Sequence, residues 1–562
     1  MAIAPEARSH PPSPGLEAQT VCGAFQATVA DRPDAPALRS LDGSVELTWQ
    51  DYGSRVRALA AGLSAHGIAR GDTLALMLTN RPEFNLVDCA AMHLGATAFS
   101  AYNTSSPEQL NYLFEDAQNR IVVTEQAFAD RVEAARPGTA VERVIVVDDG
   151  GLEELESAGN PEFDFDYVWR EVQPDDVLTL IYTSGTTGPP KGVQLTHANM
   201  MFELRALQAA APVSPGGRIV SFLPAAHIAD RWSAHYSPMG HGATVTCCPD
   251  PTQVLAAAAA TRPTVFGGVP RVWEKLKTAL EAQIGPDPGA LDEATKAGVR
   301  AKLGFDEVEW FVSGAAPIPT AVLDFFIALG VPICELWGMS ETTAVATINP
   351  RDDIRVGTVG VALPGVEVKL ADDGEVLVRG ANVMKGYRNM PEKTAEAMLE
   401  DGWLATGDIG EMSDDGFLTI VDRKKELIIN AAGKNMSPAN IEATLKSASP
   451  LIGQACVIGD RRPYNVALIV LDPDAAPAFA ERNDLDSGAL GALSSTETVI
   501  AAVAEGVNAA NERLSRVEQI KKFKILDEDW LPGGDELTPT MKLKRKPIAE
   551  KYLEEIEALY LD

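Results

Sequence analysis

The sequence predicts an α/β protein in which helices cover a largely parallel sheet, with a smaller β-rich part further along the chain. Segments with strand character alternate with segments of helical periodicity, which is the pattern of consecutive βα units. Between Val356 and Asp422 this pattern gives way to short strands separated by glycine turns, which predicts a small β subdomain. The length of 562 residues and the 46% apolar content allow about three or four domain-sized units.

The individual elements follow from apolar periodicity, turn residues and caps. Strands are expected at residues 72–78, 96–102, 120–124, 143–148, 177–182, 219–223, 243–248, 454–459 and 465–471, and a hairpin at 366–379. Helices are expected at residues 17–29, 49–66, 82–94, 106–117, 197–211, 442–447 and 496–514. Pro107 suits the first turn of its helix, and Thr196 is the expected N-cap of the helix that begins at His197.

Charge and cysteine content argue against several classes of protein. Asp and Glu number 79 against 48 Lys and Arg, a net charge of −31, so repulsion disfavours non-specific binding to nucleic acid or to an anionic membrane. Six cysteines without a Cys-x-x-Cys pair predict neither a disulfide framework nor a zinc site, and Cys247 and Cys248, in an expected strand, are predicted to be buried thiols. The amino terminus lacks the apolar core of a signal peptide, and no apolar run is long enough for a transmembrane segment. A cytoplasmic protein is therefore expected.

A polar loop directly after the strand at 177–182 is the central motif. It reads Thr183-Ser184-Gly185-Thr186-Thr187-Gly188 and is followed by two prolines and Lys191. Glycines let the backbone approach a polyphosphate, hydroxyls donate to its oxygens, and the lysine offsets its charge. The spacing is not that of a Walker loop, because no Gly-Lys-Ser/Thr sequence follows. The composition alone favours an ordinary surface loop, and a polyphosphate loop is the alternative, which the longer match described below supports.

A second motif runs from Trp337 through Gly338, Met339 and Ser340 to Glu341. The flat face of Trp337 can stack on a base, and the carboxylate of Glu341 is a hard oxygen ligand of the kind that Mg²⁺ prefers. Taken alone, Glu341 would be an ordinary surface carboxylate.

Two further stretches follow strand ends. The strand at Trp310 breaks on the small residues Gly314, Ala315 and Ala316, which leave a gap. His227 comes after another strand, where open α/β sheets bind their ligands. A lone histidine is more often structural, so its position is the argument for a role.

These motifs, in this order, resemble those of the AMP-forming adenylating enzymes and, within them, the long-chain branch of the acyl-CoA synthetases. The resemblance extends from about Gln26 to Tyr552. It implies a large N-terminal AMP-binding domain of layered αβα subdomains at residues 16–424, including a small β subdomain at about 355–422. It also implies a smaller, mobile α+β domain at residues 425–562.

The resemblance assigns roles residue by residue. The positions expected to contact ATP or coenzyme A are Thr183, Ser184, Gly185, Thr186, Thr187, Gly188, Lys191, Gly314, Ala315, Ala316, Trp337, Gly338, Met339, Ser340, Asp408, Arg423, Lys425, Gly433 and Lys434. Among them, Asp408 and Arg423 are expected at the ribose, and Lys425 as the hinge of the mobile domain. Gly433 is expected near the pantetheine of coenzyme A, and Lys434 near a phosphate.

The catalytic residues implied by the resemblance are Lys542, Glu341 and His227, the last beside the substrate carboxylate. Glu341 and Thr183 are the expected Mg²⁺ ligands. Two departures from the common family pattern stand out. Trp337 occupies a position where tyrosine is commoner, and Met541 replaces the glycine that usually precedes the catalytic lysine. Because of the second departure, Lys544 is the alternative to Lys542.

The function implied is an ATP-dependent, AMP-forming acyl-CoA ligase that activates a medium- or long-chain fatty acid through an acyl-adenylate. ATP, Mg²⁺ and coenzyme A are the expected cofactors and cosubstrates, and a homodimer is compatible with the family. Three alternatives are open. They are a fatty acyl-AMP ligase that delivers to a separate carrier protein, a ligase for aryl or other carboxylic acids, and a non-catalytic nucleotide-binding protein.

Overall fold

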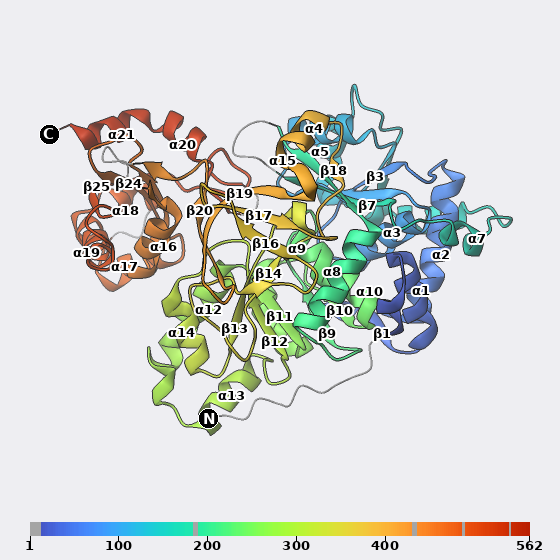
Figure 1. Ribbon diagram of the computed structural model, residues 1–562, viewed down its shortest axis with the longest axis horizontal. Helices are drawn as coiled ribbons and strands as arrows, with labels where there is room; N and C mark the ends of the chain where they lie inside the picture. The colour runs from blue at the N-terminus through green and yellow to red at the C-terminus, as the bar shows by residue number, and fades with distance from the viewer. Residues whose placement is uncertain (1–12, 184–188, 430–434, 486–488, 539–540, 562) are drawn as a thin grey trace.

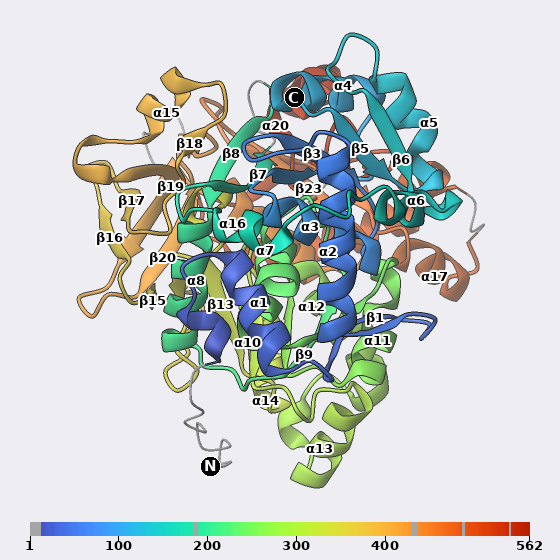
Figure 2. The ribbon, with the colours of Figure 1, turned by 90° about the vertical axis from the view of Figure 1, so that its right-hand side faces the viewer.

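The computed structural model describes residues 13–183, 189–429, 435–485, 489–538 and 541–561. The predicted α/β architecture is confirmed: sheets and helices form a large N-terminal body, and the last part of the chain forms a smaller lobe beside it (Figure 1). Figure 2 shows helices α1 and α2 on the face turned away from that lobe.

The largest sheet has seven strands in the order β18-β8-β7-β4-β3-β5-β6. Its strands are β3 (Thr73–Met77), β4 (Thr97–Ser100), β5 (Ile121–Thr124), β6 (Arg143–Val146), β7 (Val177–Thr183), β8 (Lys191–Thr196) and β18 (Gly386–Tyr387). Strands β3 to β7 run parallel, whereas β8 is antiparallel to β7 and β18 is antiparallel to β8. The predicted parallel arrangement thus holds except at one edge.

Helices cover this sheet and the sheet beside it. They are α1 (Val21–Asp31), α2 (Trp49–Ala65), α3 (Pro82–His93), α4 (Pro107–Ala117), α5 (Gln126–Ala135), α6 (Gly151–Ser157), α7 (Phe165–Arg170) and α8 (His197–Ala210). Most were expected, but α5, α6 and α7 were not. The helix expected at 17–29 begins only at Val21, because Thr20 is its N-cap and accepts a hydrogen bond from the backbone N–H of Gly23.

Two further sheets complete the N-terminal body. One has the order β2-β1-β10-β9, with β1 (Pro36–Ser40), β2 (Glu46–Thr48), β9 (Arg218–Ser221) and β10 (Thr244–Cys247). The other has the order β11-β12-β13-β14-β15, with β11 (Val265–Gly268), β12 (Trp310–Ser313), β13 (Ile333–Trp337), β14 (Thr347–Ile348) and β15 (Val361–Ala362). Their helices include α11 (Val254–Thr261), α12 (Pro270–Ile284), α13 (Glu293–Lys302) and α14 (Thr320–Ala328).

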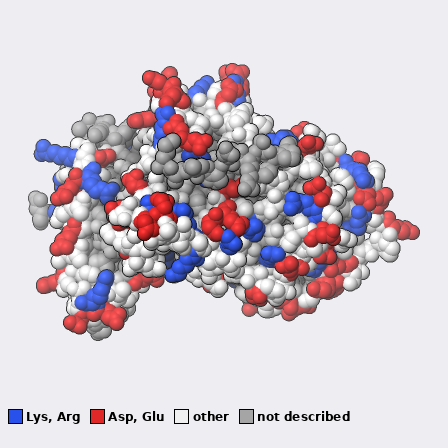
Figure 3. All heavy atoms as spheres, turned by 90° about the horizontal axis from the view of Figure 1, so that it is seen from below, with Lys and Arg blue, Asp and Glu red and all other residues white. Residues whose placement is uncertain are grey.

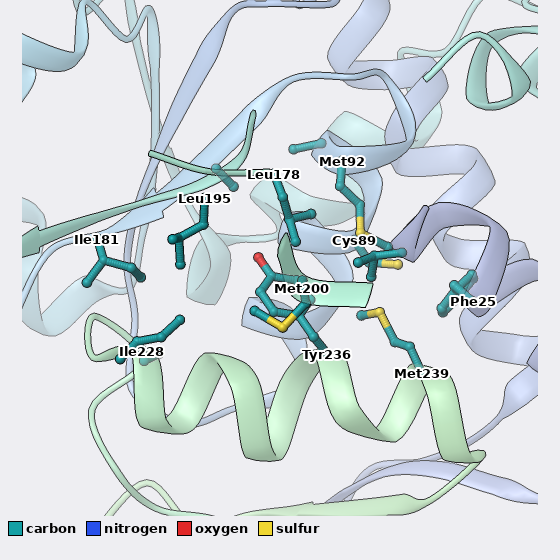
Figure 4. Close-up of a cluster of buried hydrophobic side chains, with 14 of the residues drawn as sticks. Phe25, Cys89, Met92, Leu178, Ile181, Leu195, Met200, Ile228, Tyr236 and Met239 are labelled. Atoms are coloured by element: carbon teal, nitrogen blue, oxygen red, sulfur yellow. The ribbon is translucent and has the colours of Figure 1, made fainter. Parts of the chain in front are cut away.

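One long helix in this body was not expected from the sequence. It consists of α9 (Ile228–Asp230), a π-helical turn, η3 (Arg231–Tyr236), and α10 (Ser237–His241). Pro238 has no N–H to donate within the helix, and the wider π turn directly precedes it. Figure 4 shows Ile228, Tyr236 and Met239 on this helix, packed against side chains of neighbouring elements.

The small β subdomain contains the predicted hairpin. Its sheet has the order β16-β17-β19-β20, with β16 (Glu367–Leu370), β17 (Glu375–Arg379), β19 (Leu404–Met412) and β20 (Leu418–Arg423). Helix α15 (Pro391–Ala397) and β18 lie within the same stretch of sequence, yet β18 pairs with β8 of the large sheet. Through this pairing, β18 forms part of the large sheet, next to the strand that starts at Lys191.

The C-terminal lobe has its own apolar cores. Its elements are β21 (Ile428–Ile429), β22 (Asn435–Met436), α16 (Pro438–Ala448), β23 (Ile452–Ile458), β24 (Asn465–Leu471), α17 (Ala475–Arg482), α18 (Leu490–Ser494), α19 (Glu497–Arg513), β25 (Ile520–Ile525), α20 (Arg545–Lys551) and α21 (Leu553–Tyr560). Ion pairs Arg271–Asp472 and Lys275–Asp474 join this lobe to α12. On the face seen from below, basic and acidic side chains intermingle (Figure 3).

Candidate active site

The two ends of the predicted polyphosphate loop are held together by the large sheet. Thr183 ends β7 and Lys191 begins β8, and the two residues are cross-strand partners. The hydroxyl of Thr183 donates to the backbone carbonyl of Lys191 at 3.4 Å. Residues Ser184 to Gly188, between them, lie outside the described residues. The described ends show that the chain returns on itself here, as a loop wrapped around a ligand must.

Lys191 and Glu341 both contact one tyrosine, Lys191 at the ring face and Glu341 at the hydroxyl. The Nζ atom of Lys191 lies 4.1 Å from the centroid of the Tyr387 ring, a cation–π contact. The hydroxyl of Tyr387 donates to Oε1 of Glu341 at 2.8 Å. Desolvation lowers the pKa of Lys191, and the charge of Glu341 opposes that shift. A phosphate-binding cation and a potential metal ligand are therefore fixed relative to each other.

A second pair of predicted residues, Trp337 and Asp408, is in direct contact. Nε1 of Trp337 donates to Oδ2 of Asp408 at 2.9 Å, and Nε of Arg423 lies 2.7 Å from Oδ1. Burial raises the pKa of Asp408, whereas Arg423, the indole N–H and Lys542 lower it. The carboxylate is thus held from both sides, as expected for an acceptor of ribose hydroxyls.

The backbone around Glu341 allows little variation. A Cβ on Gly338 would lie 2.2 Å from the carbonyl oxygen of Ala344, so only glycine fits there. Thr343 and Ala344 adopt positive φ angles of 56° and 99°. The buried Glu203 accepts from the backbone N–H of Val345 at 3.0 Å, and burial raises its pKa well above the ordinary value. Glu203 stabilises the strained turn that carries Glu341.

The small residues after β12 also have an unusual backbone. Ala315 adopts a φ of 71°, and a Cβ on Gly314 would lie 2.5 Å from a methyl group of Leu336. Leu336 directly precedes Trp337, so the predicted gap at residues 314–316 follows β12 and the predicted stacking residue ends the neighbouring strand β13. Met339 and Ser340 follow at the start of a single 3₁₀ turn.

His227 caps the long unexpected helix. Its Nδ1 accepts from the backbone N–H of Ala229 at 3.1 Å, and this bond fixes the ring so that Nε2 can serve another partner. Desolvation, together with the charge of Lys542, lowers the pKa of His227 to about 4. At neutral pH the ring is therefore neutral.

The choice between the two candidate lysines depends on where each side chain is anchored. Lys544 donates to the carbonyl of Gly534 at 2.7 Å. The charges around Lys542 come from Arg423, Asp408 and Glu341 of the N-terminal body and from Glu426 of the lobe. Desolvation and the charge of Arg423 lower the pKa of Lys542, whereas Asp408, Glu426 and Glu341 raise it. The geometry favours Lys542 as the lysine that serves this site.

Other predicted residues lie at the boundary of the lobe. Lys425 is exposed in the turn after β20, and its charge contributes to the lowered pKa of Lys191. Lys424, to which no role was given, forms ion pairs with Asp373 and Glu375. Gly433 and Lys434 lie outside the described residues.

Sequence reasoning missed Tyr387 and Glu203. Tyr387 follows Lys385 and Gly386 in a short strand, and nothing in its local pattern indicates a partner on the distant Glu341. Glu203 lies in the middle of α8, where a glutamate is normally a solvent-exposed residue. Only the folded structure shows that it is buried.

Comparison with known proteins defines the class of this enzyme. A family model described as AMP-binding enzyme matches residues 25–388, and one described as AMP-binding enzyme C-terminal domain matches residues 425–562. The chain belongs to the AMP-binding enzyme family.

Individual relatives narrow the class. A protein of Mycobacterium tuberculosis named as a fatty-acid–CoA ligase, FadD11, is 50% identical over 440 residues, covering 72% of this chain and 77% of its own length. FadD15 of the same species, named as a long-chain-fatty-acid–CoA ligase, is 36% identical over 577 residues, with coverage of 94% and 95%. The Xenopus laevis long-chain-fatty-acid–CoA ligase ACSBG2 is 31% identical over 631 residues, with coverage of 97% and 84%. The predicted AMP-forming acyl-CoA synthetase, which uses ATP and coenzyme A, is confirmed.

Solved structures share the fold. The o-succinylbenzoate-CoA synthetase MenE from Bacillus subtilis, in complex with an acyl-adenylate intermediate, aligns with a TM-score of 0.74 at 25% identity, covering 93% of this chain and 97% of its own. A fatty acyl CoA synthetase of M. tuberculosis aligns with a TM-score of 0.66 at 24% identity, with coverage of 96% and 99%. The second likeness concerns the fold alone.

Proposed function

We propose that this enzyme activates a medium- or long-chain fatty acid, first to an acyl-adenylate and then to an acyl-CoA thioester. The names of its relatives supply the substrate class. The observation that carries the proposal for this chain is the position of Lys542, whose charge acts on His227, Asp408 and Glu341 of the N-terminal body. This is the arrangement that the first half-reaction requires.

In that half-reaction, a fatty acid carboxylate oxygen attacks the α-phosphorus of ATP and the bond to pyrophosphate breaks. An anionic nucleophile meets an anionic phosphate, so the site must neutralise charge. We assign Lys191 to the departing phosphates, Lys542 to the acyl and α-phosphate oxygens, and Ser340 and the loop from Thr183 to Gly188 as hydroxyl and N–H donors. A neutral His227 beside the acyl carboxylate would orient that carboxylate without neutralising its negative charge.

Mg²⁺ fits the residues present. Among the described residues, no group of three or more His, Cys, Asp or Glu side chains could hold a metal ion. Glu341 supplies a buried carboxylate already oriented by Tyr387, and Mg²⁺ commonly binds through one or two carboxylates together with substrate phosphates. Glu341 and Thr183 would hold the ion, which would offset phosphate charge when bound.

The second half-reaction requires a path for the thiol of coenzyme A to the acyl carbon, where it displaces AMP. Lys542 stands in the site during the first step, so we propose that residues 425–562 move as a domain, away from the body at 16–424. Lys425 would be the hinge. Gly433 would then approach the pantetheine and Lys434 a phosphate of coenzyme A.

The test is a screen of pyrophosphate exchange into ATP across short to very long aliphatic acids and aromatic acids. Exchange that peaks with medium or long aliphatic chains, and acyl-CoA and AMP formation that depends on coenzyme A, would support the proposal. Release of AMP only with a carrier protein would indicate an acyl-AMP ligase, and a preference for aromatic acids would indicate an aryl-CoA ligase. No exchange with any acid would indicate a nucleotide-binding protein without catalysis.

Location and assembly stay predictions. None of the described helices is both long enough and apolar enough to span a bilayer. A cytoplasmic enzyme and a homodimer are consistent with the proposal, and fractionation and light scattering would test them.

A further inference from the structure

Asp408 is a nearly buried carboxylate, 4% exposed, with a hydrogen-bond donor at one oxygen and a cation beside the other. Trp337 donates to Oδ2 through its indole N–H, and Arg423 approaches Oδ1 through Nε. Trp337 is itself buried at the end of β13. The backbone N–H of Asp408 is also engaged, because it donates to the hydroxyl of Thr406 at 3.1 Å. The carboxylate therefore has little freedom to rotate.

A carboxylate offers about four acceptor positions, two on each oxygen. The hydrogen bond from Trp337 uses one position on Oδ2 and the ion pair with Arg423 lies at Oδ1, so each oxygen keeps a position for a further donor. Two hydroxyls on adjacent carbons of a ribose match that pair of remaining positions. Which way the remaining positions face depends on the rotation of the carboxylate, and the indole N–H is the neutral, rigid donor that sets this rotation.

We propose that Trp337 is a positioning residue whose indole N–H orients Asp408 to accept both hydroxyls of the nucleotide ribose. The proposal deepens the proposed function, since it concerns the ATP site, and goes beyond stacking of the ring on adenine. Phenylalanine and tyrosine both offer an aromatic face, but neither has a donor at the place of Nε1. The tryptophan at this position thus adds a fixed donor that the commoner tyrosine does not supply there.

The charges facing Asp408 support this role. Arg423 and Lys542 favour the ionised form, and Asp422 opposes it. Removal of the indole donor leaves Oδ2 without its protein partner and weakens the preference for ionisation. Nucleotide binding by a variant without the donor should therefore weaken more at low pH than binding by the wild type.

The experiment measures equilibrium binding of AMP, 2′-deoxy-AMP and 3′-deoxy-AMP by calorimetry, which requires no acid substrate and no turnover. The variant Trp337→Phe keeps an aromatic face and removes the donor. We expect it to bind AMP about tenfold more weakly, since a hydrogen bond to a charged group is involved, and to lose most of the discrimination between AMP and the deoxy nucleotides. Trp403→Phe, which alters a ring that contacts Lys369 and Arg379 in the β subdomain, is the matched control and should bind AMP as the wild type does.

The double variant Trp337→Phe/Asp408→Asn completes a thermodynamic cycle. If Trp337 acts through Asp408, the phenylalanine substitution should cost little in the Asp408→Asn background. Equal weakening of AMP and both deoxy nucleotides by Trp337→Phe, or equal costs in the two backgrounds, would overturn the proposal in favour of stacking or packing alone.

The failure of this inference and the failure of the proposed function are distinguishable. A wild type that binds AMP with the expected discrimination but exchanges no pyrophosphate would keep the role of Trp337 and remove the catalytic assignment. A wild type that binds no nucleotide would overturn both. Thermal unfolding of Trp337→Phe close to that of the wild type would show that the loss is not one of folding.

Discussion

The hydroxyl of Tyr387 donates a hydrogen bond to the carboxylate of Glu341, 2.8 Å away. The contact exists because β18 pairs with β8, which brings Tyr387 to the edge of the large sheet beside Lys191. One aromatic side chain thus connects the cation at the start of β8 with the carboxylate that follows β13. We therefore expect metal and phosphate recognition to be coupled through it.

Tyr387→Phe should raise the Mg²⁺ concentration needed for half-maximal pyrophosphate exchange by about three- to tenfold, because Glu341 loses a donor worth roughly 1–1.5 kcal/mol. The ring and its contact with Lys191 remain in this variant. Tyr387→Leu removes both and should lose a further two- to fivefold, as a cation–π contact of about 0.5–1 kcal/mol predicts. A Tyr387→Phe enzyme with an unchanged Mg²⁺ dependence would contradict the coupling.

Lys542→Ala should reduce acyl-adenylate formation by at least about 10²-fold, because a positioned charge in the transition state is removed. Thioester formation from synthetic acyl-AMP should be retained, since the thiol step does not use this lysine. The two half-reactions are measured separately by pyrophosphate exchange and by acyl-CoA release. Lys544→Ala is the matched control and should retain adenylation, because Lys544 donates to the carbonyl of Gly534. Equal loss of both half-reactions in Lys542→Ala would refute the assignment.

Arg231→Met should destabilise the fold by about 3–5 kcal/mol, because the buried carboxylate of Asp88 loses its arginine partner and is left with His235 and the hydroxyl of Tyr236. The side chains of Arg231 and Asp88 are fully buried, at 2.5 Å from each other, in the π-helical turn and α3. The control is Arg57→Met, whose partner Asp166 is exposed and whose loss should cost less than about 1 kcal/mol. Urea unfolding followed by circular dichroism measures both, and similar costs would contradict the assigned role of the buried pair.

Met541→Gly should stabilise the protein by about 0.5–1 kcal/mol. Met541 adopts a φ of 64°, which costs a residue with a Cβ roughly 1–2 kcal/mol, and the greater chain entropy of glycine offsets part of the gain. Met541→Val, with a branched side chain, should destabilise it instead. Thermal unfolding of the three proteins distinguishes these outcomes, and an unfavourable effect of glycine would show that the methionine side chain compensates for the backbone.

The free energy of unfolding should decrease as the pH falls, because buried histidines such as His241 resist protonation in the folded state. Desolvation lowers the pKa of His241 from 6.5 to about 4, so the folded state takes up its proton at a lower pH than the unfolded chain does. The contribution of neutral His241 to the free energy of unfolding is complete above pH 6.5. It is lost as the pH falls toward 4, at about 1.4 kcal/mol per pH unit. His241→Gln should therefore show a shallower loss over this range in urea unfolding at several pH values. Parallel curves for wild type and variant would exclude this contribution.

Local patterns in the sequence were sufficient to predict most helices and strands and the chemical groups of the motifs. The N-cap Thr196 and the first-turn Pro107 form as expected, because each depends only on its own side chain and the next turn. The cysteines predicted as buried thiols are all buried and unpaired. Helices α5, α6 and α7 were missed, since they are short and their apolar positions are few.

The sequence by itself determined which side chains this enzyme has available: the hydroxyls, glycines and lysine of the phosphate loop, the carboxylates Glu341 and Asp408, and Lys542. Only the tertiary structure decided their partners, namely Tyr387 for Glu341, Trp337 for Asp408, and the N-terminal body for Lys542. The physical reason is the distance along the chain over which each property acts. Propensity, periodicity and side-chain chemistry are properties of neighbouring residues, whereas a hydrogen bond across 2.9 Å between distant positions depends on how whole sheets pack.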